Sequence, residues 1–318
     1  MNSIKLETGQ WQFRAVGESE WMPISIPGEV HVALMEAGRI PDPFAADNEL
    51  KVQWVAETDW EFEGIIHVSD ELMREEHILL RFDGLDTLAE VSINGHLLGK
   101  TDNAFRRYSW EVKDFLSFGE NRVRILFQSP VNYVKPLQDA NPLANPEMSI
   151  PGGPYLRKAP CQWGWDWGPM LPPIGVWKEA YLEGFSIARL SSIRINQEHK
   201  FSGAVIVSID AEIETWSSES LQLCLTLRDP EGKTFATTCK IIKGSAHAMI
   251  EISDPILWWP NGYGDQALYQ ARIGLRTDDE TVLDVRAYQL GLRKLVLRQD
   301  KDEFGESFTF VVNDIPIF

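Results

Sequence analysis

The chain has 318 residues, of which 44% are hydrophobic and 24% are charged, which is typical of a globular protein of about two domains. Its 47 acidic residues outnumber 30 basic ones and give a formal net charge of −17, which disfavours nucleic acids and anionic membranes as partners. The three cysteines fit neither a disulfide framework nor a metal site, and no apolar run is long enough to span a membrane.

The first ten residues are polar and lack the apolar core of a secretory signal, so we expect a cytoplasmic protein. The six histidines are scattered without metal-ligand spacing. The stretch Gly262-Tyr263-Gly264 lacks the third glycine and the following helix of a dinucleotide loop. We therefore predict no metal ion and no cofactor.

The first half of the chain predicts short strands with one early helix. Apolar residues recur at helical spacing in 30–37 and then alternate with polar ones in 78–82, 89–93 and 123–127. Asn94-Gly95 directly follows one alternating run and predicts a tight hairpin. Such a series of strands and turns is typical of a β-sandwich.

The stretch 131–160 is rich in Pro, Asn and Gly, and its composition predicts a long surface loop. It leads into 162–169, QWGWDWGP, where Trp163, Trp165 and Trp167 alternate with small or polar residues. On an extended segment these three indoles would share one face. Flat indoles pack on sugar rings and a fixed carboxylate accepts hydrogen bonds from hydroxyls, so Trp165 and Asp166 suit sugar binding.

A second set of alternating strands follows. The pattern is clearest in 205–213, 221–227 and 269–275, where every second residue is apolar. These strands predict a second sandwich, of the immunoglobulin-like kind.

Several of these segments together resemble the β-mannosidases of glycoside hydrolase family two, in the clan that also holds β-galactosidase and β-glucuronidase. The longest matching segment is 157–169, RKAPCQWGWDWGP, followed by Gly175-Val176-Trp177. Shorter similarities lie in 27–44, 84–95, 102–108 and 257–264.

The resemblance implies an all-β architecture. A jelly-roll, sugar-binding-type sandwich would cover 1–186 and an immunoglobulin-like sandwich 187–296. Residues 297–318 would be a linker and the first strand of a (β/α)8 barrel, and the chain ends at Phe318, where the family continues into that barrel.

A retaining glycosidase of this kind uses two carboxylates roughly 5–5.5 Å apart, which the family carries on its barrel. The resemblance therefore assigns no catalytic residue to this chain and implies that it is inactive alone. Asn48-Glu49 is similar to the family's acid/base dipeptide, but its position predicts a loop contact instead. In the resembled family, an aspartate in a loop of the first domain contacts the sugar. The resemblance therefore implies that the Asp166 carboxylate binds sugar hydroxyls and that Trp165 lies beside it in the pocket wall.

The favoured hypothesis is that the chain is the N-terminal, non-catalytic part of a β-mannosidase that removes terminal β-D-mannose from β-mannosides. Its expected partners are the catalytic barrel and a β-mannoside substrate. Three alternatives remain open: part of a sibling β-galactosidase or β-glucuronidase, a stand-alone carbohydrate-binding module, or a structural or partner-binding protein. The tryptophan segment disfavours the sibling glycosidases.

Overall fold

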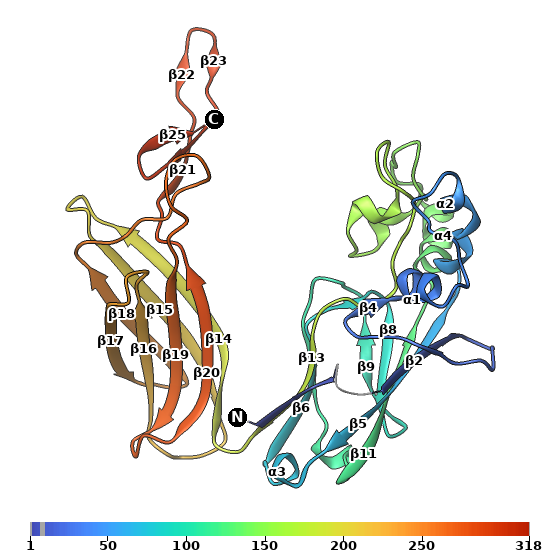
Figure 1. Ribbon diagram of the computed structural model, residues 1–318, viewed down its shortest axis with the longest axis horizontal. Helices are drawn as coiled ribbons and strands as arrows, with labels where there is room; N and C mark the ends of the chain where they lie inside the picture. Colours follow the sequence, from blue (N-terminus) through green and yellow to red (C-terminus); the bar gives the residue numbers. More distant parts are fainter. Residues whose placement is uncertain (1, 7–9, 318) are drawn as a thin grey trace. The chain divides into compact units, whose positions relative to one another are not determined.

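The computed structural model describes residues 2–6 and 10–317. The chain divides into two compact units, Met1–Phe185 and Ser186–Phe318 (Figure 1). Both units are built mainly from antiparallel strands with few helices, so the predicted all-β class is confirmed. No helix in the described part of the chain is long and apolar enough to cross a membrane.

The first unit is a β-sandwich with one large and one smaller sheet. The six-stranded sheet has the order β3-β2-β5-β11-β8-β9, and the four-stranded sheet has the order β1-β13-β6-β10. The strands of the larger sheet are β2 (Gln10–Ala15), β3 (Met22–Pro23), β5 (Trp60–Val68), β8 (Ala89–Ile93), β9 (His96–Thr101) and β11 (Gly119–Phe127). Those of the smaller sheet are β1 (Asn2–Lys5), β6 (His77–Phe82), β10 (Tyr108–Glu111) and β13 (Ala180–Phe185).

The core between these sheets follows from the alternation in the sequence. Ala89, Val91 and Ile93 of β8 are buried, whereas the intervening Glu90 and Ser92 are partly exposed. In the hairpin after β8, both Asn94 and Gly95 have positive φ, 48° and 84°. That geometry is the tight turn for which Asn-Gly is favoured, so the predicted hairpin is confirmed.

A small third sheet, β4-β12-β7, joins segments that lie far apart in the sequence. Its strands are β4 (Gly28–Glu29), β7 (Leu85–Asp86) and β12 (Gly175–Val176). Helix α1 (Val30–Glu36) follows β4, as predicted, and the Glu29 side chain caps it by accepting hydrogen bonds from the backbone N–H groups of His31 and Val32. The remaining α-helices of the described first unit are α2 (Asn48–Lys51), α3 (Asp70–Met73) and α4 (Pro130–Ala140).

Helix α4 corrects the prediction that all of 131–160 is a surface loop. Ser129 caps it by accepting a hydrogen bond from the Asn132 N–H at 3.0 Å, and Pro130 occupies its first turn, where proline costs no hydrogen bond. Val134 is fully buried against Leu88, Leu156 and Trp163. Pro136 lies inside the helix, where proline normally disfavours helix formation, and this obscured the helix in the sequence. Tertiary packing of the helix outweighs the energetic penalty of Pro136.

The second unit pairs a three-stranded sheet, β14-β15-β18, with a four-stranded sheet, β17-β16-β19-β20. The predicted alternation is confirmed, since every second residue from Val205 to Ile213 is buried. The strands are β14 (Ala188–His199), β15 (Val205–Thr215), β16 (Leu221–Arg228), β17 (Thr234–Lys240), β18 (Ser245–Ile252), β19 (Tyr269–Thr277) and β20 (Val282–Leu290).

The last described residues form a small antiparallel sheet, β21-β24-β25, and a two-stranded ribbon, β22-β23. These strands are β21 (Leu295–Arg298), β22 (Lys301–Asp302), β23 (Gly305–Glu306), β24 (Thr309–Val312) and β25 (Ile315–Ile317). Within the second unit, Asn313 Nδ2 donates to the Trp258 carbonyl at 3.0 Å and ties this segment to the connection between β18 and β19.

Candidate functional site

The tryptophan segment forms a tight turn whose tip is exposed. The Trp165 N–H donates to the Gly168 carbonyl at 3.0 Å, and the Gly168 N–H donates back to the Trp165 carbonyl at 3.3 Å. Asp166 and Trp167 stand at the tip, and Trp167 is 79% exposed. The indole rings of Trp165 and Trp167 lie 5.4 Å apart between centroids.

The prediction that the three indoles share one face is wrong. A short 3-10 helix, Pro160–Trp163, precedes the turn, and Gly164 then reverses the chain at φ +105°. As a result Trp163 is buried at 2% exposure, whereas Trp165 is 38% exposed. Pro160 starts the helical turn and Gly164 ends it. The segment with alternating tryptophans therefore does not form an extended strand.

Gly164 is required where it stands. A Cβ on this residue would lie 2.5 Å from the Met170 Cγ and 2.7 Å from the Met148 carbonyl oxygen. The positive φ adds a second reason, since other residues rarely adopt it. Gly164 therefore allows the turn to pack closely on both neighbouring segments.

Helix α2 holds the chain on the far side of the turn. Glu49 Oε1 accepts a hydrogen bond from the Met170 N–H at 3.1 Å. Gln53 Nε2 donates to the Met170 carbonyl at 2.8 Å and to the Glu49 carbonyl at 2.9 Å. The prediction that Asn48-Glu49 makes a loop contact is confirmed.

A buried ion pair fixes the base of the same region. Lys158 Nζ lies 2.6 Å from Asp86 Oδ2 and donates to the Pro173 carbonyl, also at 2.6 Å. Lys158 and Asp86 are only 3% and 4% exposed. Burial lowers the pKa of Lys158, and the charge of Asp86 opposes that change. The pair links β7, the segment before the turn and the segment after it.

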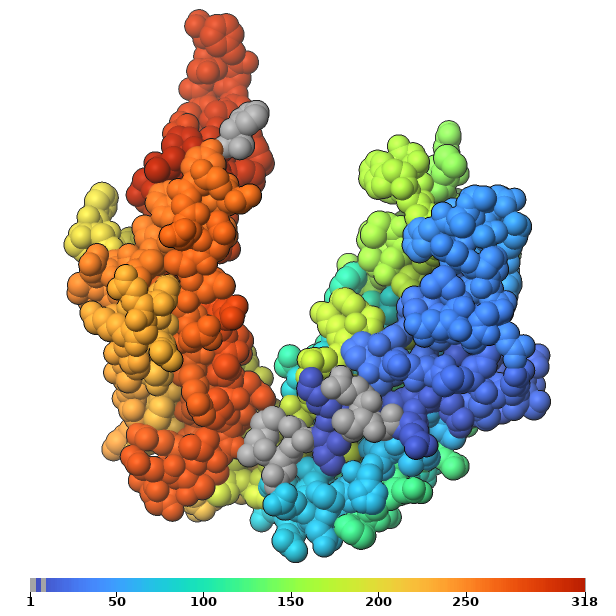
Figure 2. Space-filling model, in the orientation of Figure 1, coloured from blue at the N-terminus to red at the C-terminus, as the bar shows by residue number. Residues whose placement is uncertain are grey.

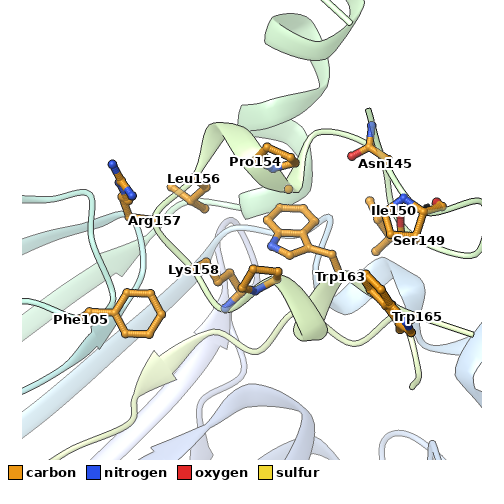
Figure 3. Close-up of a pocket in the computed structure, with 14 residues that line it drawn as sticks. Phe105, Asn145, Ser149, Ile150, Pro154, Leu156, Arg157, Lys158, Trp163 and Trp165 are labelled. Carbon is orange, nitrogen blue, oxygen red and sulfur yellow. Dashed lines mark hydrogen bonds between the residues drawn. The ribbon is translucent and has the colours of Figure 1, made fainter. Parts of the chain in front are cut away.

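Beside the turn lies a pocket of about 360 Å³ (Figure 3). The Trp163 indole stands between Phe105 on one side and Trp165 on the other. Other lining residues include Ser149, Leu156 and Arg157, and the lining contains no aspartate or glutamate. The pocket therefore offers aromatic surface and hydrogen-bonding groups, but no carboxylate that could act as acid, base or nucleophile.

The structure places the two predicted site residues differently. Trp165 lines the pocket, whereas Asp166 does not and is exposed at the tip. Among the described residues, no side-chain cation lies within 4.0 Å of the Asp166 carboxylate, and Arg157 does not pair with it. No group of three His, Cys, Asp or Glu side chains in the described part of the chain could hold a metal ion.

Sequence reasoning did not single out Phe105 as a site residue, although it lines the pocket. A parallel bridge joins Asn103 to Arg157, and the Ala104 N–H donates to the Arg157 carbonyl at 2.9 Å. These contacts bring Phe105 to the pocket. No local signal could have found it, because the contact joins segments distant in sequence.

Comparison with known proteins identifies the family. Residues 11–178 match the glycosyl hydrolase 2 galactose-binding domain-like family, and residues 188–293 match the immunoglobulin-like region described as glycosyl hydrolases family 2. The chain belongs to glycosyl hydrolase family 2. The predicted membership and the predicted pair of sandwiches are thereby confirmed.

Within family 2, similar proteins carry the name β-mannosidase. Beta-mannosidase B of Neosartorya fischeri is 32% identical over 97% of this chain, and that of Aspergillus oryzae is 31% identical over 98%. The crystal structure of a β-D-mannosidase from Dictyoglomus thermophilum matches all of the chain with a TM-score of 0.90 and 34% identity.

An exo-chitosanase of Amycolatopsis orientalis, another structural match, has a TM-score of 0.73 at 18% identity, which shows a shared fold alone. This family 2 chain spans only 37% of the Neosartorya protein and 39% of the Dictyoglomus chain.

Proposed function

We propose that this chain is the non-catalytic, substrate-shaping part of a retaining β-mannosidase that hydrolyses terminal non-reducing β-D-mannose residues. The observation that carries the proposal is the 34% identity and TM-score of 0.90 to the Dictyoglomus thermophilum β-D-mannosidase over the whole chain. Matches to a β-galactosidase and a β-glucuronidase are 16% identical, which favours the mannosidase over those siblings.

The proposed role of the chain is to position a sugar, because hydrolysis with retention needs two carboxylates roughly 5–5.5 Å apart. Those would come from a catalytic domain that accounts for the unmatched length of the relatives. Asp166 would accept hydrogen bonds from sugar hydroxyls, and Trp165 would form the adjoining wall. Exposure of both side chains on an anchored turn supports these roles.

A chimera tests the proposal. This chain would replace the matching 39% of the Dictyoglomus thermophilum enzyme, and hydrolysis of an aryl β-mannoside would be measured for the chimera, for this chain alone and for the truncated enzyme. We expect activity in the chimera only. A folded chimera that cleaves aryl β-galactosides or β-glucuronides but not β-mannosides would refute the mannosidase assignment.

A second candidate function is a carbohydrate-binding module that acts without a catalytic domain. The aromatic pocket beside Trp163 favours it, since such a pocket could hold a sugar without any other domain. The same chimera separates the two functions: a module would leave the chimera without mannosidase activity.

A role in cytoplasmic carbohydrate metabolism completes the proposal. Its support is that Cys161, Cys224 and Cys239 are all free thiols, as is usual in a reducing compartment. Fractionation of the producing cells, with detection of the protein by antibody, would test the location.

A further inference from the structure

A patch of aromatic and cationic side chains lies on the surface of the first unit. This cation–aromatic patch consists of Phe105, Arg106, Arg157, Trp177 and Lys178, all of which are exposed. Its two rings are uncovered to a large extent, with Phe105 at 60% and Trp177 at 41% exposure. Large apolar side chains that are grouped and left exposed mark surfaces that bind a partner.

Hydrogen bonds between segments distant in sequence hold the patch together. Trp177 Nε1 donates to the Ala104 carbonyl at 2.9 Å, and the Ala104 N–H donates to the Arg157 carbonyl at 2.9 Å. The Lys178 ammonium lies 4.2 Å from the Trp177 ring centroid. These contacts join three segments into one continuous surface that is formed before any partner binds.

The three cations of the patch form no ion pair within the described part of the chain. The neighbouring carboxylates are engaged elsewhere: Asp83 pairs with Arg107 at 2.7 Å, and Glu179 pairs with Lys5 at 3.1 Å. The Asp102 carboxylate accepts a hydrogen bond from a tyrosine hydroxyl. Uncovered positive charge is unexpected on a chain of net charge −17, and a partner surface that carries carboxylates would complement it.

The patch adjoins the tryptophan turn. Phe105 and Arg157 line the same pocket as Trp165, and Figure 3 shows them across Trp163 from Trp165. In Figure 2 the segment around the turn, in yellow-green, stands out from the surface of the first unit. A protein domain that closes over the turn therefore also approaches the patch.

The proposed function requires the catalytic domain to close over this turn. If Asp166 holds hydroxyls of a mannose, the two catalytic carboxylates must flank the glycosidic bond of the same ring. The catalytic domain then comes as close to the tip of the turn as one sugar ring is wide. A body of domain size at that distance covers part of the surface beside the turn as well.

Charge distinguishes the patch from the other flank of the turn. That flank carries Phe44, which lines a smaller cavity of about 150 Å³ together with Leu171 and Pro173. The residues that line this cavity include no lysine or arginine. Arginine and aromatic residues are enriched at protein interfaces, so the cation–aromatic patch is better suited to hold a protein surface.

We propose that the cation–aromatic patch is the docking surface for the catalytic domain, and that the facing surface of that domain carries carboxylates. Arg106, Arg157 and Lys178 pair with those carboxylates, and the rings of Phe105 and Trp177 form the apolar centre of the contact. Aromatic and arginine side chains contribute most of the binding energy at such interfaces. The identity of the partner rests on the proposed function.

Hydroxyl-radical footprinting of the 318-residue chain and of the mannosidase chimera tests the docking surface. Phe105 and Trp177 should react several-fold more slowly in the chimera, because the catalytic domain covers them. Phe44, which is 78% exposed on the other flank, should react equally in both proteins. The buried Trp163 should stay unreactive in both, which shows that the first unit is folded.

Charge reversal tests the ion pairs of the docked state. Arg157→Glu in the chimera should return the reactivity of Trp177 toward that of the isolated chain, because it sets like charges against each other. Arg74→Glu is the matched control, since Arg74 is exposed at the end of α3 and lies outside the patch. It should leave Trp177 protected.

The proposal is overturned if Phe105 and Trp177 react equally in the chain and in the chimera, or if Phe44 is protected in their place. Equal effects of the two charge reversals would overturn the role of the cations. An active chimera with an unprotected patch would overturn the docking surface and leave the proposed function intact. A folded chimera with a protected patch but no mannosidase activity would support the docking surface and count against the proposed function.

Discussion

The Glu49 carboxylate accepts a hydrogen bond from the backbone N–H of Met170 and so fastens helix α2 to the tryptophan turn. Glu49 and Met170 are distant in sequence, and neither belongs to the exposed tip. The contact makes Glu49 a positioning residue for Trp165 and Asp166.

Glu49→Ala should loosen the turn without unfolding the first unit. We expect a loss of about 0.5–1.5 kcal/mol in the free energy of unfolding, typical of one hydrogen bond. Protease cleavage within 164–170 should become faster. The matched control is Glu57→Ala. The Glu57 side chain is exposed, and among the described residues Glu57 makes hydrogen bonds through its backbone N–H and carbonyl. Equal cleavage rates in both variants would contradict the positioning role.

Asp166→Asn in the mannosidase chimera should lower kcat/KM on the order of 10- to 150-fold. A hydrogen bond to a charged group contributes roughly 1.5–3 kcal/mol, and each 1.4 kcal/mol corresponds to a factor of ten. The melting temperature should change little, because Asp166 is exposed. Asp254→Asn, at an exposed aspartate of the second unit, serves as control. Near-normal kcat/KM would remove Asp166 from the substrate site.

Gly164→Ala should destabilise the first unit more than Gly17→Ala does. Both glycines have positive φ, 105° and 94°, so both substitutions carry a conformational penalty of about 1 kcal/mol or more. Only at Gly164 would the new methyl group also collide with the Met148 carbonyl oxygen, because nothing lies within 4 Å of the Cβ position at Gly17. Denaturant unfolding of both variants measures the difference, and equal losses would show that the turn relaxes freely.

Lys158→Met should be among the most destabilising single substitutions in the first unit. It leaves the Asp86 carboxylate buried without its cation, which typically costs about 3–5 kcal/mol. Lys135→Met removes an exposed partner of Asp139 and should cost about 0.5 kcal/mol or less. Urea unfolding distinguishes the two, and a small loss for Lys158→Met would mean that water reaches Asp86.

The acid stability of the first unit should depend on Asp83. Burial alone would raise the pKa of this carboxyl, but hydrogen bonds and charge from Arg81 and Arg107 outweigh burial and lower the pKa below its ordinary 3.8. The unfolded state therefore binds the proton first as pH falls. The stability that Asp83 contributes is complete above about pH 4 and is lost below it.

Asp83→Asn should accordingly lower the free energy of unfolding by about 1–2 kcal/mol at neutral pH, and the difference from the wild type should shrink as pH falls below 3.8. Unfolding titrations at several pH values measure this. A difference that stays constant down to pH 3 would contradict the assignment, and Arg107→Gln should have no further effect in the Asp83→Asn background.

The sequence predicted those features that depend on local pattern. Alternation located the strands, Asn94-Gly95 located a hairpin, and the tryptophan segment pointed to the family. The geometry of that segment was mispredicted, because the positive φ of Gly164 and the helical turn at Pro160 depend on how Met148 and Met170 pack. Phe105 was missed for a related reason: the single backbone bridge that brings it to the pocket leaves no trace in spacing or composition.

The anchoring of the tryptophan turn has a consequence for the entropy of binding. The two backbone hydrogen bonds across Trp165 and Gly168, together with the contact from Glu49, restrict the turn when the chain folds. Ordering a mobile, rotamer-rich side chain at an interface costs about 0.5–1.5 kcal/mol. Because the backbone that carries Trp165 is already ordered, a ligand would lose entropy only in ordering the side chain, and more of the contact energy would remain as affinity.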